Sequence, residues 1–182
     1  KTAQPGILAP VPPQGRYLFF SLKDSSALRD ALQRLAPLVD GPQTVVGIGP
    51  DVVAALGGAV PGLRVFAALQ GPGVTVPATP ASLWCWQRGA DRGKLVHATR
   101  ALEKALAPAL RLDAVIEAFR HGRGPNGLGR DLTGYEDGTE NPEGASADKA
   151  SIAANTRSRS PGRQPTESTP ASGTSRRCFR SP

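Results

Sequence analysis

Between residues 15 and 122, strand-like apolar runs alternate with helix-like segments, and this alternation most limits the folds open to the chain. Four strands are predicted, at residues 15–22, 44–49, 82–89 and 111–122, although the apolar spacing of the last also allows a helix. Helices are predicted at 24–40 and 91–110, with a short third helix at 50–58 that begins at a proline. Without the short helix, the order β-α-β-β-α-β predicts an α+β, ferredoxin-like antiparallel sheet with the helices on one face.

Side-chain spacing within these segments predicts which faces are buried. Trp84 and Trp86 alternate with Leu83 and Cys85, which places the tryptophans on the opposite side of a strand from the other two. The helix at 24–40 is expected to be capped by Asp24, Ser25 or Ser26 and to bury a leucine stripe that starts at Leu28. Residues 63–69 are predicted as a short strand or turn, and residues 70–80 as an irregular connector.

The character of the chain changes at residue 144. Residues 1–143 are predicted to form one domain, whereas residues 144–182 are predicted to be a disordered tail because Ile152 and Phe179 are their only large apolar side chains. The tail has seven basic and two acidic residues, so it carries five of the chain's seven net positive charges. The folded part is therefore close to neutral. Specific nucleic-acid binding is not expected, since the basic tail lacks interleaved aromatic residues.

Composition also excludes several classes of protein. Two cysteines are too few for a disulfide framework or a Cys-rich metal site, and Cys85 and Cys178 are interpreted as a buried thiol and a tail thiol. No apolar run is long enough to span a membrane, and the proline-rich start does not resemble a secretion signal, so a cytoplasmic location is predicted. The chain starts with Lys1 and contains no methionine, so we expect the natural start to be missing or trimmed.

The stretch GRDLTGYEDGTENPEG, at 129–144, places Glu136, Asp137 and Glu140 among glycines. A calcium loop that starts at Asp131 is excluded because Glu136 falls where an EF-hand requires glycine. A dinucleotide-binding turn at GIGPDV is disfavoured, since Val52 occupies the third glycine position. The residues of the acidic loop leave two interpretations open: Asp137 is a positioned proton acceptor, or the loop is a capped turn.

Other reactive side chains favour structural interpretations. His97 lies opposite the apolar stripe of its helix and is predicted to be solvated, and His121 follows the last strand between two arginines. Neither histidine is assigned a function. Trp84 and Trp86 are interpreted as packing residues of a strand rather than as redox relays.

The segment GYEDGTENP resembles the signature loop of the dye-decolourising (DyP-type) peroxidases, whose hallmark is Gly-x-x-Asp-Gly. Gly134, Asp137 and Gly138 match that hallmark, and the resemblance extends over about residues 4–144. It implies the first of two ferredoxin-like halves that hold haem b (iron protoporphyrin IX). It also implies a haem-dependent peroxidase that reduces hydrogen peroxide and oxidises dyes, phenols or similar reductants.

By this resemblance, Asp137 is the distal acid–base residue, and Gly138, Thr139, Glu140 and Asn141 lie at the haem edge. An aspartate stays ionised at lower pH than a histidine, so the resemblance predicts an acidic optimum. Members of the family tend to form homo-oligomers, and some are encapsulated through a C-terminal extension that is not identified here. No iron ligand is assigned to this chain.

The sequence leaves the family pattern after about residue 144, before the segments that supply the proximal histidine and the distal arginine in the family. We interpret residues 144–182 as translation in a shifted reading frame of a GC-rich gene rather than as a natural disordered tail. The alternative to a peroxidase is therefore a truncated, haem-free and catalytically inactive half-domain.

Overall fold

The computed structural model describes residues 4–149, except 132, 141 and 148. Its centre is a four-stranded sheet formed by β1 (Gln14–Leu22), β2 (Thr44–Ile48), β5 (Leu83–Gly89) and β6 (Leu110–Phe119). The strand order is β2-β5-β1-β6, and every neighbouring pair is antiparallel. This arrangement confirms the predicted α+β fold with its ferredoxin-like order, and all four predicted strands form.

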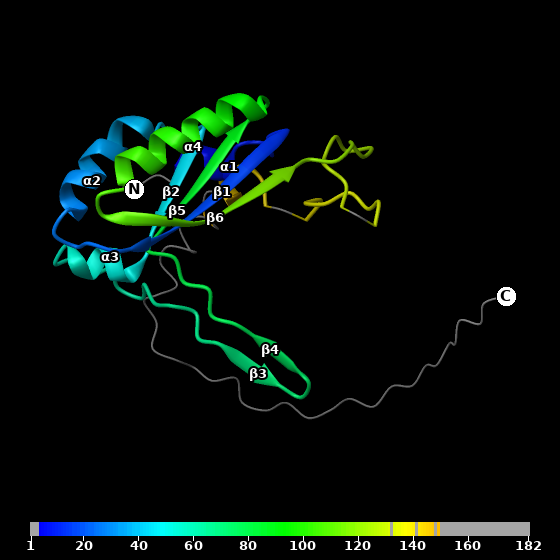
Figure 1. The fold of residues 1–182 in the computed structure, drawn as a ribbon. Helices are drawn as coiled ribbons and strands as arrows, with labels where there is room; N and C mark the ends of the chain where they lie inside the picture. The colour runs from blue at the N-terminus through cyan, green and yellow to red at the C-terminus, as the bar shows by residue number, and fades with distance from the viewer. Residues whose placement is uncertain (1–3, 132, 141, 148, 150–182) are drawn as a thin grey trace.

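Two helices, α2 (Leu28–Leu35) and α4 (Arg92–Leu106), lie side by side on one face of the sheet (Figure 1). They bury a core with β1, β5 and the start of β6, which includes Leu18, Phe20, Leu28, Leu83, Cys85, Leu102, Leu106 and Leu110. Asp91 caps α4, since its carboxylate accepts a hydrogen bond from the backbone N–H of Lys94 at 2.8 Å. The leucine stripe of α4 is buried and His97 is exposed, as predicted.

Helix α2 begins later than predicted. The Asp24 carboxylate accepts hydrogen bonds from the backbone N–H and the hydroxyl of Ser26, at 2.8 and 2.6 Å, and so closes a turn ahead of the helix. Ala27 is the N-cap residue, without a side-chain cap. Pro37 has no N–H to donate, and α2 is followed directly by a 3-10 turn, η1 (Ala36–Leu38).

The opposite face of the sheet is aromatic. Tyr17 on β1 stacks between Trp84 and Trp86 on β5, with ring centroids 5.9 Å apart in each pair. The guanidinium of Arg88 lies 4.6 Å from the centroid of the Trp86 ring. Burial of Leu83 and Cys85 on the helical side confirms the predicted alternation along β5.

The sequence-based prediction of an irregular connector before β5 is wrong. After α3 (Pro50–Ala55), the chain forms a separate hairpin of β3 (Leu69–Gly71) and β4 (Val74–Val76), which projects from the body (Figure 1). Pro72 and Gly73 make its turn, and Gly73 has the positive φ of 72° that such a turn requires. Strands of three residues are too short to show an alternating pattern, which is why the sequence predicts an irregular connector instead of this hairpin.

The start of the described chain protects one edge of the sheet. A helical turn, α1 (Pro5–Leu8), packs beside β2, and the side-chain amide of Gln4 both donates to the carbonyl of Val46 and accepts from its N–H. Gly6 makes this close approach possible, because a Cβ there would lie 2.6 Å from the carbonyl oxygen of Gly41. The edge strand β2 is therefore covered by the proline-rich lead-in.

Beyond β6, the chain folds back as a loop and then forms a helical turn at 144–147, which starts where the tail was predicted to be disordered. The prediction for the rest of the tail, including Cys178, lies outside the described residues. Among the residues that the structure describes, no helix combines the length and apolarity needed to cross a bilayer.

Candidate functional site

The acidic loop is part of a double turn that closes the far end of β6. The backbone N–H of Arg130 donates to the carbonyl of His121 at 2.8 Å, and that of Asp137 donates to the carbonyl of Gly129 at 2.9 Å. Isolated β-bridges join Arg130 to His121 on one side and to Glu136 on the other. Residues 121–137 therefore form two successive reversals, and the acidic segment packs against the chain that leaves the sheet.

Glu136 holds the first reversal together. One oxygen of its carboxylate accepts from the backbone N–H groups of Asn126 and Leu128, at 3.0 and 2.9 Å, and the other accepts from the Asn126 side-chain amide at 2.8 Å. Desolvation raises the pKa of Glu136, but the hydrogen bonds from Leu128 and Asn126 together lower it below its ordinary value. Glu136 is thus a structural anion of the loop.

Asp131 has the same function in the second reversal. Its carboxylate accepts from the hydroxyl and the N–H of Thr133, at 2.6 and 2.8 Å, and from the N–H of Tyr135 at 3.1 Å. The hydrogen bond from the Thr133 hydroxyl is the main reason why the pKa of Asp131 is lowered. Arg130 adds a crosslink by donating to the carbonyl of Gly134 at 2.6 Å.

Asp137 differs from both. Among the described residues its carboxylate accepts no hydrogen bond, and the side chain is exposed at a cavity of about 250 Å³. Six of the residues around this cavity are Val11, Phe119, Arg120, His121, Arg130 and Asp137. Of the three carboxylates in residues 131–137, Asp137 is therefore the one that accepts no hydrogen bond from a described residue and lies open to a small molecule in the cavity.

The lead-in to β1 forms the opposite wall of this cavity. The N–H of Arg120 donates to the carbonyl of Pro13 at 3.1 Å, and its guanidinium donates to that of Val11 at 3.5 Å. Arg88 fixes the same lead-in by donating to the carbonyls of Ala9, at 3.2 Å, and Pro10. Residues more than a hundred positions apart in the sequence thus meet around Asp137.

Of the predicted site residues that the structure describes, Asp137 alone lines the cavity. Gly138, Thr139 and Glu140 lie in the turn that follows it, and Asn141 lies outside the described residues. Gly138 has φ 87°, a conformation that a residue with a Cβ rarely adopts, so glycine is required there. The proposed contacts of Thr139, Glu140 and Asn141 with a cofactor stay predictions.

Sequence reasoning missed the basic side of the cavity. Arg120, His121 and Arg130 were not assigned to a site, although all three lie within two residues of a glycine in the stretches FRHGRG and LGRDL. Glycines on both sides of basic residues are a signal of tight turns that can bring such side chains together. Their approach to Asp137 depends on the double turn, which no short motif predicts.

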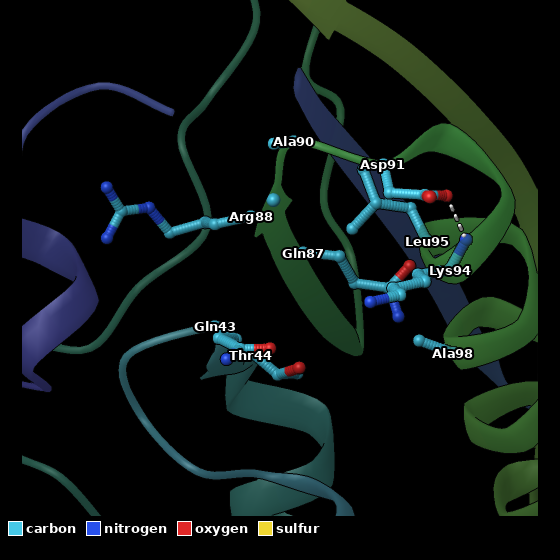
Figure 2. A pocket seen from close by; sticks show the side chains of 10 residues that line it. Gln43, Thr44, Gln87, Arg88, Ala90, Asp91, Lys94, Leu95 and Ala98 are labelled. Atoms are coloured by element: carbon cyan, nitrogen blue, oxygen red, sulfur yellow. Dashed lines mark hydrogen bonds between the residues drawn. The ribbon is translucent and has the colours of Figure 1, made fainter. Parts of the chain in front are cut away.

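A second cavity, of about 360 Å³, lies at the start of α4 (Figure 2). Its walls include Gln43, Gln87, Asp91 and Lys94. Asp91 already caps the helix, and the buried side chain of Gln87 lies 2.6 Å from the Thr99 hydroxyl. Since Asp91, the carboxylate in this wall, already has a partner within the fold, this cavity supplies no acid–base group comparable to Asp137.

No group of three or more potential metal ligands is found within residues 4–149, so far as the structure describes them. His97 lies on α4, and His121 is beside Asp137. Among the described residues, His121 is therefore the histidine that lies near the acidic loop.

No family model matches the chain. A curated dye-decolorizing peroxidase from Mycolicibacterium paratuberculosis is 33% identical over 154 residues, which cover 78% of this chain and 42% of that relative. The cryo-EM structure of an encapsulated DyP-type peroxidase from Mycobacterium smegmatis superposes with a TM-score of 0.63 at 26% identity, over 79% of this chain and 49% of that one. A Rhodococcus jostii DypB variant in complex with heme has a TM-score of 0.64 at 24% identity, over 78% of this chain and 49% of that one.

Proposed function

Because the chain belongs to the dye-decolourising peroxidase family and spans less than half the length of the curated relatives it matches, we propose that it supplies the acid–base half of a haem-dependent peroxidase. Asp137 is the proposed catalytic residue. The observation that carries the proposal is the contrast within the loop: Asp131 and Glu136 bind the loop backbone, whereas the Asp137 carboxylate faces a cavity and accepts no hydrogen bond from a described residue.

The overall reaction defines the task of this carboxylate. Hydrogen peroxide takes up two electrons and two protons and yields two molecules of water, while two reductant molecules lose one electron and one proton each. Haem b, when bound, supplies the redox chemistry that accepts the two oxidising equivalents of the peroxide. Asp137 accepts a proton from one peroxide oxygen and returns it to the other, so that this oxygen leaves as water rather than as hydroxide.

The described residues fit one side of a haem site. A cavity of about 250 Å³ is smaller than the roughly 300–1,000 Å³ pockets that enclose drug-sized ligands, so it cannot surround a macrocycle. His121 lines the same cavity as Asp137. Gly138, Thr139, Glu140 and Asn141 are the residues that would hold the edge of a haem beside Asp137.

A second candidate function follows from that same geometry. A chain that offers an acid–base loop but no ligand on the opposite side would be a haem-free half-domain without catalytic activity. The small size of the cavity, which cannot surround a macrocycle, favours this alternative. The carboxylate of Asp137, which accepts no hydrogen bond from a described residue, favours the peroxidase.

Haem titration of the purified chain separates the two candidates. A peroxidase half-site that binds haem gives a saturable Soret band that responds to hydrogen peroxide, whereas the alternative gives the spectrum of free haem. In a haem-binding chain, we expect Asp137→Asn to retain the Soret band and slow its reaction with peroxide by about 100-fold or more.

Glu103→Gln is the matched control, because it removes one exposed carboxylate from α4, remote from the loop. His121→Ala tests whether that histidine replaces the missing ligand, since its loss then shifts or abolishes the band. A chain in which Asp137→Asn reacts with peroxide as fast as the unchanged chain contradicts the assignment of Asp137.

A further inference from the structure

The lead-in to β1, residues 5–13, forms one wall of the cavity at the acidic loop with little apolar burial of its own. Pro10 and Val11 line that cavity, yet Pro10 is exposed and Val11 is 59% exposed. Ile7 and Leu8, earlier in the same segment, are 46% and 45% exposed. Burial of apolar side chains therefore contributes little to the position of this wall.

Three prolines prevent the lead-in from joining the sheet as a regular strand. Pro10, Pro12 and Pro13 have no N–H to donate to a neighbouring strand. Their carbonyl groups can still accept hydrogen bonds, so the attachment of this stretch depends on donors from the body of the protein. Arg88 and Arg120 supply such donors.

Arg88 is a buried cation that forms no ion pair with a carboxylate in the part of the chain that the structure describes. Its guanidinium donates to the carbonyls of Ala9, at 3.2 Å, Pro42, at 3.4 Å, and Pro10, and it lies over the ring of Trp86. Burial lowers the pKa of Arg88, but an arginine stays charged in a protein. Carbonyl dipoles and an aromatic face therefore stabilise this charge in place of an acid.

Only a guanidinium suits this arrangement. Its planar fork has five N–H donors, so it can reach carbonyls of two separate segments while it stacks on Trp86. One segment is the lead-in, at Ala9 and Pro10, and the other is the turn before β2, at Pro42. The ammonium group of a lysine has the same charge but is a single point, and it cannot occupy all of these positions at once.

The hydrogen bonds of Arg88 reach the cavity through Pro10. The carbonyl of Pro10 accepts from Arg88, and Pro10 itself lines the cavity that Asp137 also lines. Val11, the next residue of the wall, is held on its other side by Arg120. The wall opposite Asp137 is therefore fixed between two arginines, and Arg120 lines the cavity whereas Arg88 acts from behind the wall.

We propose that Arg88 is a positioning residue of the candidate site, which fixes the cavity wall beside Asp137 by holding the carbonyls of Ala9 and Pro10. A wall held in one position limits the arrangements that a small molecule can take next to the carboxylate. The catalytic consequence rests on the proposed function, whereas the position of the wall does not depend on haem.

Nuclear magnetic resonance of the full chain without haem tests the position of the wall. The chain has two histidines, of which His121 lines the cavity and His97 is exposed on α4. In Arg88→Lys and in Arg88→Ala, we expect the imidazole signal of His121 to move while that of His97 stays in place. Arg64→Ala, which removes an exposed arginine between α3 and β3, is the control and should move neither signal.

Hydrogen exchange gives a second readout on the same samples. The amide of Arg120 donates to the carbonyl of Pro13 at 3.1 Å, so its exchange should become at least about tenfold faster in Arg88→Lys, while the amides of β1 keep their rates. Equal acceleration along β1 would show that Arg88 supports the whole sheet and would overturn the proposal. A lysine variant with unchanged His121 signal and unchanged exchange would overturn it as well.

The peroxide reaction separates this proposal from the proposed function. In a chain that binds haem, we expect Arg88→Lys to keep the Soret band and to slow its reaction with peroxide by about tenfold or more. An unchanged rate in a variant whose wall has moved overturns the positioning role of Arg88 and leaves the assignment of Asp137 intact. In a chain that binds no haem, the peroxidase proposal fails, and the His121 signal still decides whether Arg88 holds the wall.

Discussion

Three carboxylates within seven residues of the acidic loop do different work, because their environments differ. Asp131 and Glu136 each accept hydrogen bonds from several donors of their own loop, which fixes their position and favours their ionised form. Asp137 lines the cavity, and its carboxylate accepts no hydrogen bond from a described residue. Substitution of Asp131 or Glu136 should therefore disturb the loop, whereas substitution of Asp137 should disturb the proposed proton transfer.

The lowered pKa values of Asp131 and Glu136 predict that the loop loosens in acid. Both carboxyls have folded-state pKa values below their ordinary values of 3.8 and 4.5, so their contribution to loop stability is complete above about pH 4.5 and is lost as pH falls through the folded-state values. We expect amide protection at Asn126, Leu128, Thr133 and Tyr135 to decrease at acidic pH. Hydrogen exchange, corrected for intrinsic rates, measures this change.

The Glu136→Gln variant provides the control for this prediction. Its side-chain carbonyl can still accept from Leu128 or Asn126 but does not titrate in this range. Protection at Asn126 and Leu128 should then lose its pH dependence, while Thr133 and Tyr135 keep theirs. Equal protection in the unchanged chain at acidic and neutral pH would show that these hydrogen bonds do not hold the loop.

At the scale of elements, α4 joins the sheet to its helical layer. It packs against α2 and contacts β1, β5 and β6, and its buried side chains include Leu95, Leu102 and Leu106. Arg92 on its first turn pairs with Glu117 on β6 at 2.5 Å, although this pair is too exposed to contribute much. The apolar face of α4, rather than its charges, therefore stabilises the fold.

Leu102 is 2% exposed, so Leu102→Ala should leave a cavity between α4 and the sheet. We expect it to lower the free energy of unfolding by about 2–5 kcal/mol. Arg100→Ala, at an exposed position of the same helix, should change it by less than about 0.5 kcal/mol. Urea denaturation measures both, and similar small effects would mean that α4 does not cover the core as described.

At the scale of the molecule, the sheet separates two surfaces. The loop with Asp137 lies at the end where β6 finishes, and the segment with the β3–β4 hairpin joins the end where β5 begins. The core between them is closed on its helical side, where Cys85 is fully buried. The proposed proton transfer at one end can therefore be altered without changing residues at the other.

Burial raises the pKa of the Cys85 thiol to about 12, so hardly any reactive thiolate forms in the folded protein at neutral pH. In a chain with Cys178→Ser, which leaves Cys85 as the one thiol, we expect a thiol reagent to react no faster than the protein unfolds. The rate should rise together with the unfolded fraction in denaturant. Rapid labelling without denaturant would indicate that the core opens locally at β5.

Elements with long periodic patterns were predictable, and short or displaced ones were not. The strand containing Trp84 and Trp86 and the helix containing Leu95, Leu102 and Leu106 form where their patterns predict. The start of α2 was wrong because Asp24 satisfies Ser26 locally instead of capping the helix. The sequence does not predict the hairpin of β3 and β4, because each of its strands has three residues.

The sequence by itself determined the strand–helix order, the buried face of each element and the loop motif around Asp137, because all of these depend on local spacing. Only the tertiary structure decided that Asp137 shares a cavity with Arg120, His121 and Arg130. It also decided that the carboxylates of Asp131 and Glu136 accept hydrogen bonds from the loop backbone. Those relations depend on hydrogen bonds across the double turn and to the lead-in at Val11 and Pro13. Contacts between segments so distant in the chain arise from folding and leave no periodic trace in the sequence.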